Sequence, residues 1–137
     1  MGKSKHSEFF EVMRNNFYFL LSTYGYTIEE PFEDYVELKS NKCKVVIIAR
    51  NGMLEVSIAP LGDTAQLLSE KNLKTNSIEL ESIVRKFAPH EKFEKSYSVY
   101  SIDEVEAEVK YNSALLRKYC MELVAGDLSE WVRIRTL

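Results

Sequence analysis

The chain contains few Cys, His, Gly and Pro residues, and each shortage excludes a class of protein. Among 137 residues there are 2 Cys, 2 His, 5 Gly and 3 Pro, while 45% of the residues are hydrophobic, which excludes a linker or a disordered tail. Cys43 and Cys120 fall far apart, one in a strand pattern and one in a helix pattern, so we expect reduced thiols in a reducing compartment. At this length, residues 1–137 form a single domain whose core needs neither a disulfide nor a metal.

The chain also lacks a basic excess, a long apolar run and a leader pattern. It carries 18 Lys and Arg against 21 Asp and Glu, a net charge of −3, whereas nucleic-acid-binding proteins usually show a basic excess. The longest apolar run, Val45 to Ala49, is far shorter than the roughly 20 residues that span a bilayer. Residues 1–7 hold no secretion signal, and His6 stands where a myristoylation motif has Ser or Thr. We therefore expect a soluble, cytoplasmic protein without nucleic-acid or membrane partners.

No catalytic or cofactor-binding signature occurs. His6 and His90 have no metal-ligand spacing to a Cys or carboxylate, no G-x-S-x-G sequence is present, and the glycines are too dispersed for a phosphate loop. Asn112, the one polar residue on an otherwise apolar helix stripe, is expected to be a buried structural anchor rather than a ligand contact, because an unsatisfied buried amide costs about 1 to 3 kcal/mol. We expect no enzyme activity, no cofactor and no metal site.

Two short turns predict a three-stranded antiparallel meander. Asn51-Gly52 is a strong signal for a two-residue hairpin between residues 44–50 and 53–59, and Asn41-Lys42 is a weaker signal for a second hairpin. Because a two-residue loop fixes the register, both hairpins place apolar side chains on one face. The predicted pairs are Val36–Ile47, Leu38–Val45, Val45–Ile58, Ile47–Val56 and Ala49–Leu54.

Helical patterns stand at both ends of the chain. Residues 7–22 carry apolar side chains at helical spacing, followed by a stop signal at Gly25. Ser101 with Glu104 forms a capping box that opens the longest helix, which we expect to end at Gly126 with a positive φ. The predicted fold class is therefore α+β, an antiparallel β-meander of three or more strands with the N-terminal helix and the long C-terminal helix packed on one face.

The remaining segments give weaker patterns. Residues 61–76 are either a mobile loop or contain a helical turn around 65–68. Asn76 with Glu79 resembles a capping box for a short helix ended by Pro89, and Phe93 to Tyr100 alternates weakly as a fourth, edge strand. Asp127 with Glu130 predicts one more short helical turn, carrying Trp131 and Ile134 onto the core.

The second face of the predicted sheet mixes apolar and charged side chains. Tyr35, Ile48 and Met53 are candidate anchors for a protein partner, and Glu37, Arg50 and Glu55 surround them. An exposed apolar strip with a charged rim usually marks a protein contact. The alternative is that a helix or the 61–76 segment covers this face.

The C-terminal third resembles a loosely defined group of small uncharacterised bacterial proteins, some of them similar to immunity proteins of toxin systems. The shared pattern is L-L-R-K-Y followed by L-x-x-G-D-x-S-x-W, here Leu115, Leu116, Arg117, Lys118, Tyr119, Leu123, Gly126, Asp127, Ser129 and Trp131. The upstream strand, residues 36–40, also fits. The resemblance implies an α+β fold and an immunity-like role, and no catalytic residue comes with it.

The order of elements is also similar to that of small acidic secretion chaperones, which work as dimers. Our leading interpretation is a non-enzymatic protein-binding module of immunity or inhibitor type. A chaperone-like homodimer is the second, and a small-ligand-binding protein or enzyme is the third. Each interpretation leaves the identity of the partner or ligand open.

Overall fold

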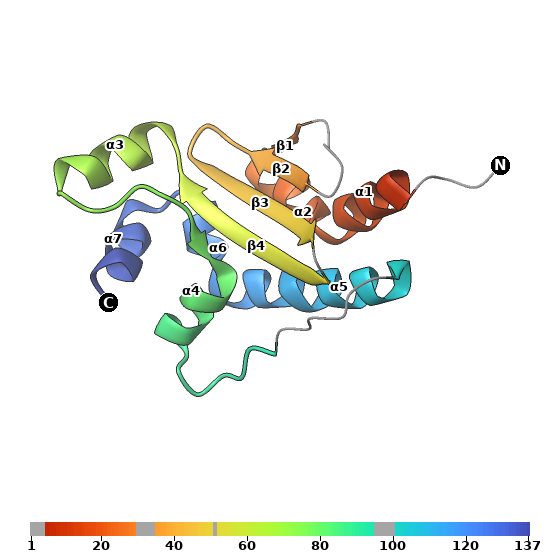
Figure 1. Ribbon diagram of the computed structural model, residues 1–137. Helices are drawn as coiled ribbons and strands as arrows, with labels where there is room; N and C mark the ends of the chain where they lie inside the picture. The colour runs from red at the N-terminus through yellow and green to blue at the C-terminus, as the bar shows by residue number, and fades with distance from the viewer. Residues whose placement is uncertain (1–4, 30–34, 51, 95–100) are drawn as a thin grey trace.

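The computed structural model describes residues 5–29, 35–50, 52–94 and 101–137 (Figure 1). Within these residues the chain forms one antiparallel sheet, in the order β1-β2-β3-β4-β5 along both the sequence and the sheet. The strands are β1 (Thr27–Ile28), β2 (Tyr35–Lys39), β3 (Cys43–Arg50), β4 (Met53–Pro60) and β5 (Ile78–Glu79).

The predicted meander and its register are confirmed. Val36 and Val56 both lie opposite Ile47, and Leu38 and Ile58 both lie opposite Val45. The turn residue Gly52 has a φ of 76°, as the hairpin requires, while Asn51 lies outside the described residues. The alternation of buried and half-buried side chains along β3 follows from this register, because successive side chains point to opposite faces.

Helices precede, interrupt and follow the sheet. In the described residues they are α1 (Lys5–Asn16), α2 (Tyr18–Tyr24), α3 (Gly62–Glu70), α4 (Leu80–Phe87), α5 (Ile102–Tyr119), α6 (Met121–Val124) and α7 (Leu128–Thr136). In Figure 1, β2 to β4 face the viewer and α2 and α6 lie behind them. We call the side that carries these helices the inner face, and the opposite side the outer face.

Two helices predicted as continuous are broken. The first breaks at Phe17, where the side chain of Asn16 donates a hydrogen bond to the Val12 carbonyl oxygen (2.8 Å) and so competes with the helical backbone. The long C-terminal helix ends at Tyr119 and not at Gly126, because Cys120 leaves the helical conformation at φ −119° and ψ 13°. The predicted capping box at Ser101 and Glu104 is confirmed, with both reciprocal hydrogen bonds present.

The segment between the sheet and the long helix differs from expectation in two places. Residues 62–70 form α3, which resolves the alternative left open for this segment. The capping box at Asn76 is wrong, because Glu79 belongs to β5 and precedes α4 without a side-chain cap. Of the expected fourth strand, Phe93 and Glu94 are not in a strand, and residues 95–100 lie outside the described residues.

The core lies between the inner face and the helices. Trp131 and Tyr26 are buried, and each donates a hydrogen bond to a carbonyl oxygen of α6: Trp131 Nε1 to Leu123 (2.9 Å) and Tyr26 Oη to Val124 (2.6 Å). Burying a hydroxyl and an indole N–H is costly unless each finds such a partner. The four-residue helix α6 is thus anchored by two buried side-chain hydrogen bonds, one from Tyr26 and one from Trp131.

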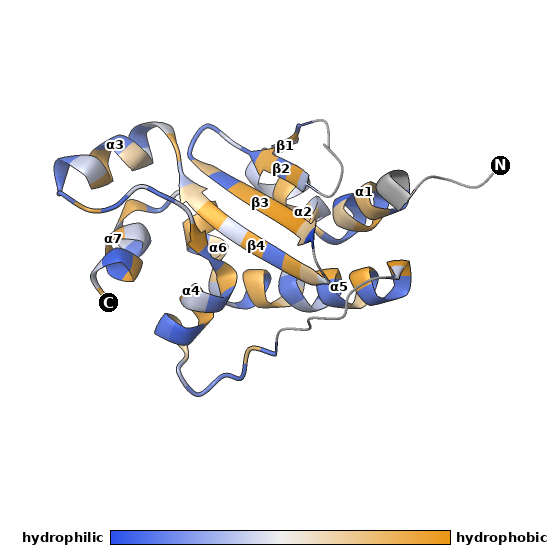
Figure 2. Cartoon of the chain, in the orientation of Figure 1, coloured by the Kyte–Doolittle hydropathy of each residue, from blue (hydrophilic) through white to orange (hydrophobic). Residues whose placement is uncertain are grey.

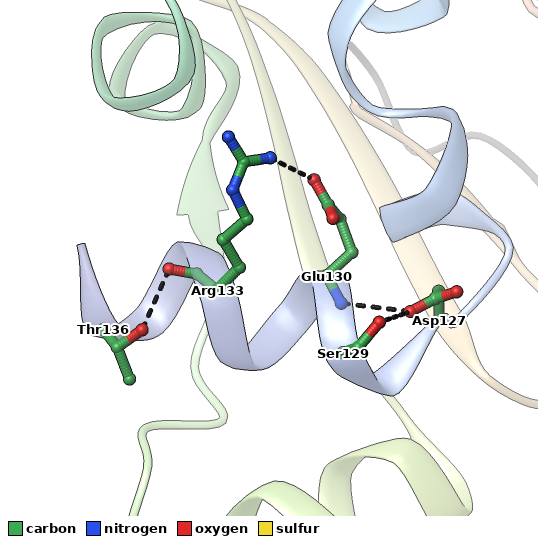
Figure 3. Close-up of polar contacts among 5 residues, drawn as sticks. All are labelled: Asp127, Ser129, Glu130, Arg133 and Thr136. Atoms are coloured by element: carbon green, nitrogen blue, oxygen red, sulfur yellow. Dashed lines mark hydrogen bonds and ion pairs between the residues drawn. The ribbon is translucent and has the colours of Figure 1, made fainter.

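The turn between α6 and α7 combines two helix caps. Gly126 has the predicted positive φ, 80°, but it follows α6 and not the long helix. The N–H groups of Gly126 and Asp127 donate to the carbonyl oxygens of Leu123 and Glu122, the pairing of a Schellman motif. Asp127 Oδ1 then accepts from the Glu130 N–H (3.0 Å) and the Ser129 hydroxyl (2.6 Å), as Figure 3 shows, so α7 begins where the sequence predicts.

Along the described parts of the chain, none of the helices combines the length and the apolarity needed to cross a lipid bilayer.

Candidate functional site

The outer face of the sheet carries the side chains that the sequence singles out. On β2, β3 and β4 none of the outer-face side chains from Tyr35 to Ser57 is fully buried, whereas the inner face is buried almost throughout. The outer-face residues are Tyr35, Glu37, Lys39, Lys44, Val46, Ile48, Arg50, Met53, Glu55 and Ser57. An open face of an antiparallel sheet is normally polar, so the apolar members of this set are unusual.

The register arranges these side chains in rows that cross the strands. Tyr35, Ile48 and Glu55 lie opposite one another in one row. Glu37, Val46, Ser57 and Glu79 form the next row, which runs from β2 to β5. Arg50 lies opposite Met53 at the hairpin end. All six predicted partner-binding residues are therefore neighbours on one surface.

The middle of this surface is an apolar ridge on β3. Val46 and Ile48 are two residues apart, so they project from the same face about 7 Å apart along the strand. Figure 2 shows β3 as a largely hydrophobic strand with hydrophilic residues near both ends, which are Lys44 and Arg50. We call Val46 and Ile48, together with Met53, which lies diagonal to Ile48 on β4, the β3 ridge.

Carboxylates stand on both sides of the β3 ridge. Glu37 lies on the β2 side, where its Oε2 accepts a hydrogen bond from the Tyr35 hydroxyl (2.8 Å). Partial burial and this bond to Glu37 raise the pKa of Tyr35. Glu79, exposed on β5, and Glu55, on β4, lie on the other side. The described part of the outer face is therefore apolar along its middle, with a carboxylate on each side and Lys39 at the end of β2.

Glu79 is a residue of this surface that the sequence pattern did not indicate. Its spacing from Asn76 predicted a helix cap, whereas pairing with Ser57 places Glu79 in the outer-face row. A two-residue strand such as β5 is too short to show an alternation of apolar and polar residues. The one signal in the sequence for the position of Glu79 is Ile78 directly before it, which pairs with Ile58 on the inner face.

Asn112 lies at a small hollow beside β4. Its side-chain Nδ2 donates to the Glu108 carbonyl oxygen of the same helix (2.8 Å), and the residue is 2% exposed. The hollow has room for about one water molecule. It is lined by Leu54, Glu55, Val56, Glu79, Leu80, Glu81, Phe93 and Asn112.

The thiols and the metal-binding residue types form no reactive group in the described chain. Cys43 and Cys120 are both buried and free, and burial raises the pKa of each thiol, to about 12 for Cys43, so they are not nucleophiles at neutral pH. No three His, Cys, Asp or Glu side chains gather closely enough there to hold a metal ion.

Two tyrosines of α5 fasten the loop that follows α4. Tyr119 donates to Glu91 Oε2 (2.8 Å), which also lies 3.6 Å from Lys118 Nζ, and Tyr111 donates to the Lys92 carbonyl oxygen (3.2 Å). The hydrogen bond from Tyr119, followed by the positive charge of Lys118, lowers the pKa of Glu91. These hydrogen bonds attach the loop to α5, and this structural role accounts for the shifted pKa of Glu91.

Comparison of the chain with protein-family models, with curated proteins and with solved structures found no match.

Proposed function

We propose that this chain is a non-enzymatic protein-binding module whose outer sheet face is its docking surface. The observation that carries the proposal is the β3 ridge: Val46, Ile48 and Met53 keep solvent exposure on a face where polar side chains are the rule. A contiguous apolar centre with a charged rim is the usual composition of a protein-binding surface.

The immunity or inhibitor type is the kind of module that we favour, on the resemblance of the C-terminal third. In the structure, the residues of that pattern have packing and capping positions: Leu116, Leu123 and Trp131 are buried, Gly126 turns the chain and Asp127 caps α7. These residues support the fold that the resemblance implies. The binding function that we propose depends on the outer face, which shares with the resemblance only the strand β2.

Position-specific cross-linking tests the proposal. A photoreactive amino acid in place of Met53, on the outer face, is compared with the same group in place of Ala114, which is exposed on α5. We expect the Met53 variant to cross-link one protein species in the native cell that the Ala114 variant does not. Equal yields at both positions, or a cross-linked species at Ala114 alone, would contradict the proposal.

A double substitution measures how much the anchors contribute. Tyr35→Ala with Ile48→Asp is expected to weaken binding of the cross-linked partner by at least about 2 kcal/mol, while the melting temperature changes little. Ile47→Asp is the matched control, because Ile47 is the neighbouring residue on the same strand but is 0% exposed, and we expect this variant to unfold. If the double variant unfolds like Ile47→Asp, the outer face is core and the proposal fails.

The dimeric alternative makes a different prediction in the same experiment. A chaperone-like homodimer that uses this face gives a cross-link at Met53 between two copies of the chain. Mass spectrometry of the cross-linked species separates a second copy from a different protein, and the double substitution then abolishes self-association.

A further inference from the structure

The shape of the outer face matches the width of an α-helix. The β3 ridge follows β3 and extends to β4 only at Met53, and neighbouring strands lie about 4.8 Å apart. Glu37 on β2 and Glu79 on β5 belong to the same row, three strand spacings or roughly 14 Å apart. A helix with its side chains is about 10 Å across. One laid along β3 has the strand of Glu37 about 5 Å to one side of its axis and the strand of Glu79 about 10 Å to the other, within reach of long side chains on its two flanks.

The arrangement of charge selects the kind of helix. Because carboxylates stand on both sides of the β3 ridge, the complementary helix carries Lys or Arg on both flanks of an apolar stripe. The cations on the described part of this face are Lys39, Lys44 and Arg50. Lys44 and Arg50 lie towards the two ends of β3, and Lys39 lies opposite Lys44 on β2, where its Nζ is 3.3 Å from Glu29 Oε1, so all three lie near the ends of such a helix rather than beside its middle.

The same arrangement disfavours a second copy of this chain. Two outer faces paired by a twofold axis that runs along β3 or at right angles to it, which keeps the two ridges aligned, bring Glu37 or Glu79 of one copy against Glu37 or Glu79 of the other. Like charges in a contact cost binding energy and suppress that pairing. A different protein is therefore the better occupant.

We propose that the outer face binds an amphipathic helix of a partner protein, lying along β3 with its apolar stripe on the β3 ridge and basic side chains beside Glu37 and Glu79. This inference rests on the proposed function and names the chemistry of the partner. It adds a helical layer to the face of the sheet that the described helices leave uncovered (Figure 1). Burial of an apolar helix stripe against an apolar sheet surface is the packing that α/β layers use.

Two synthetic peptides test directly whether the outer face prefers a helix with basic flanks. Both have about 18 residues and the same leucine stripe at helical spacing, and they differ only in the flanks, which are lysine in one and glutamate in the other. Fluorescence anisotropy measures the binding of each labelled peptide to the full chain. We expect the lysine-flanked peptide to bind about tenfold more tightly at low salt, and the difference to shrink as salt screens the charges.

Variants of the protein test whether Glu37 and Glu79 cause the preference for the lysine-flanked peptide. Glu37→Gln with Glu79→Gln is expected to weaken binding of the lysine-flanked peptide about fivefold, the size expected for two ion pairs at a protein surface. Glu70→Gln with Glu122→Gln removes the same charge from exposed positions on α3 and α6 and is expected to change nothing. Glu37→Lys with Glu79→Lys is expected to reverse the preference between the peptides, and circular dichroism confirms that each variant is folded.

The outcomes separate this inference from the proposed function. If the Met53 cross-link forms but the two peptides bind equally, or the Glu37 and Glu79 variants bind like the control variant, the helix is wrong and the docking surface stands. If Met53 cross-links a second copy of the chain, the inference is overturned in favour of the homodimer. If the outer-face cross-link is itself absent, the proposed function fails, and the inference fails with it.

Discussion

Substitution of Gly62 by Ala is expected to be strongly destabilising, because two separate costs meet at this residue. Gly62 begins α3 with a φ of 54°, a region in which a residue with a Cβ costs about 1 to 2 kcal/mol. A Cβ at this position also falls 2.4 Å from the Asn41 backbone oxygen, well inside van der Waals contact. Asn41 cannot move aside freely, because the next residue, Lys42, accepts a hydrogen bond from the Leu61 N–H (2.8 Å). Overpacking of this kind typically costs about 1 to 3 kcal/mol, so the expected total is about 3 kcal/mol.

Comparison with Gly25 separates the cost of the positive φ from the cost of the steric clash. Gly25 has a similar φ, 69°, but a Cβ there meets no atom within 4 Å, so Gly25→Ala is expected to lose only about 1 kcal/mol. Urea unfolding followed by the fluorescence of Trp131, the one tryptophan and fully buried, measures both variants. The reasoning is refuted if Gly62→Ala loses no more stability than Gly25→Ala.

Two other measurements check the interior. Gly126→Val is expected to cost at least about 1 kcal/mol, because φ is 80° and the new Cβ would lie 2.6 Å from Lys42 Cβ; a urea midpoint equal to that of the wild type would contradict this. Burial raises the pKa of Cys43 from 9.0 to about 12, so the folded state favours the protonated thiol, and its contribution to stability is present below pH 9 and is lost as the pH rises from about 9 to about 12. Cys43→Ala is therefore expected to show a shallower alkaline loss of stability than the wild type, and an unchanged slope would contradict the assignment.

The meander could be predicted because the residues that determine its pairing are close together in the sequence. A two-residue loop fixes which residues pair, and the strand period of two then fixes which side chains share a face. Once Ile47 and Val56 are paired, the places of Ile48 and Glu55 on the opposite face follow. For that reason the candidate surface could be derived together with the core.

The helix breaks could not be predicted, because the apolar periodicity continues through them. Phe17 and Cys120 each interrupt a helix and are each 0% exposed, so both breaks keep the apolar stripe directed at the core. A short break changes the direction of the axis without changing which side chains are buried. Only tertiary packing distinguishes the two arrangements, and a periodic pattern does not contain it.

The strands β1 and β5 were missed for a different reason. Each is two residues long and pairs over two residues, so neither has an alternation of its own. Their position is imposed by the neighbouring strand, as the pairing of Glu79 with Ser57 shows. For this reason the sequence alone did not predict that Glu79 lies beside the β3 ridge.

The order of the strands and helices along the chain has a consequence for folding during synthesis. The sheet is complete at residue 79, but α5, α6 and α7, which close over its inner face, come from residues 102–136. Until residues 102–136 have left the ribosome, a nascent chain has only the earlier helices to cover Val45, Ile47 and Val56. Incompletely covered strands are where unfinished chains associate, so association between chains is favoured most in the interval before α5 emerges.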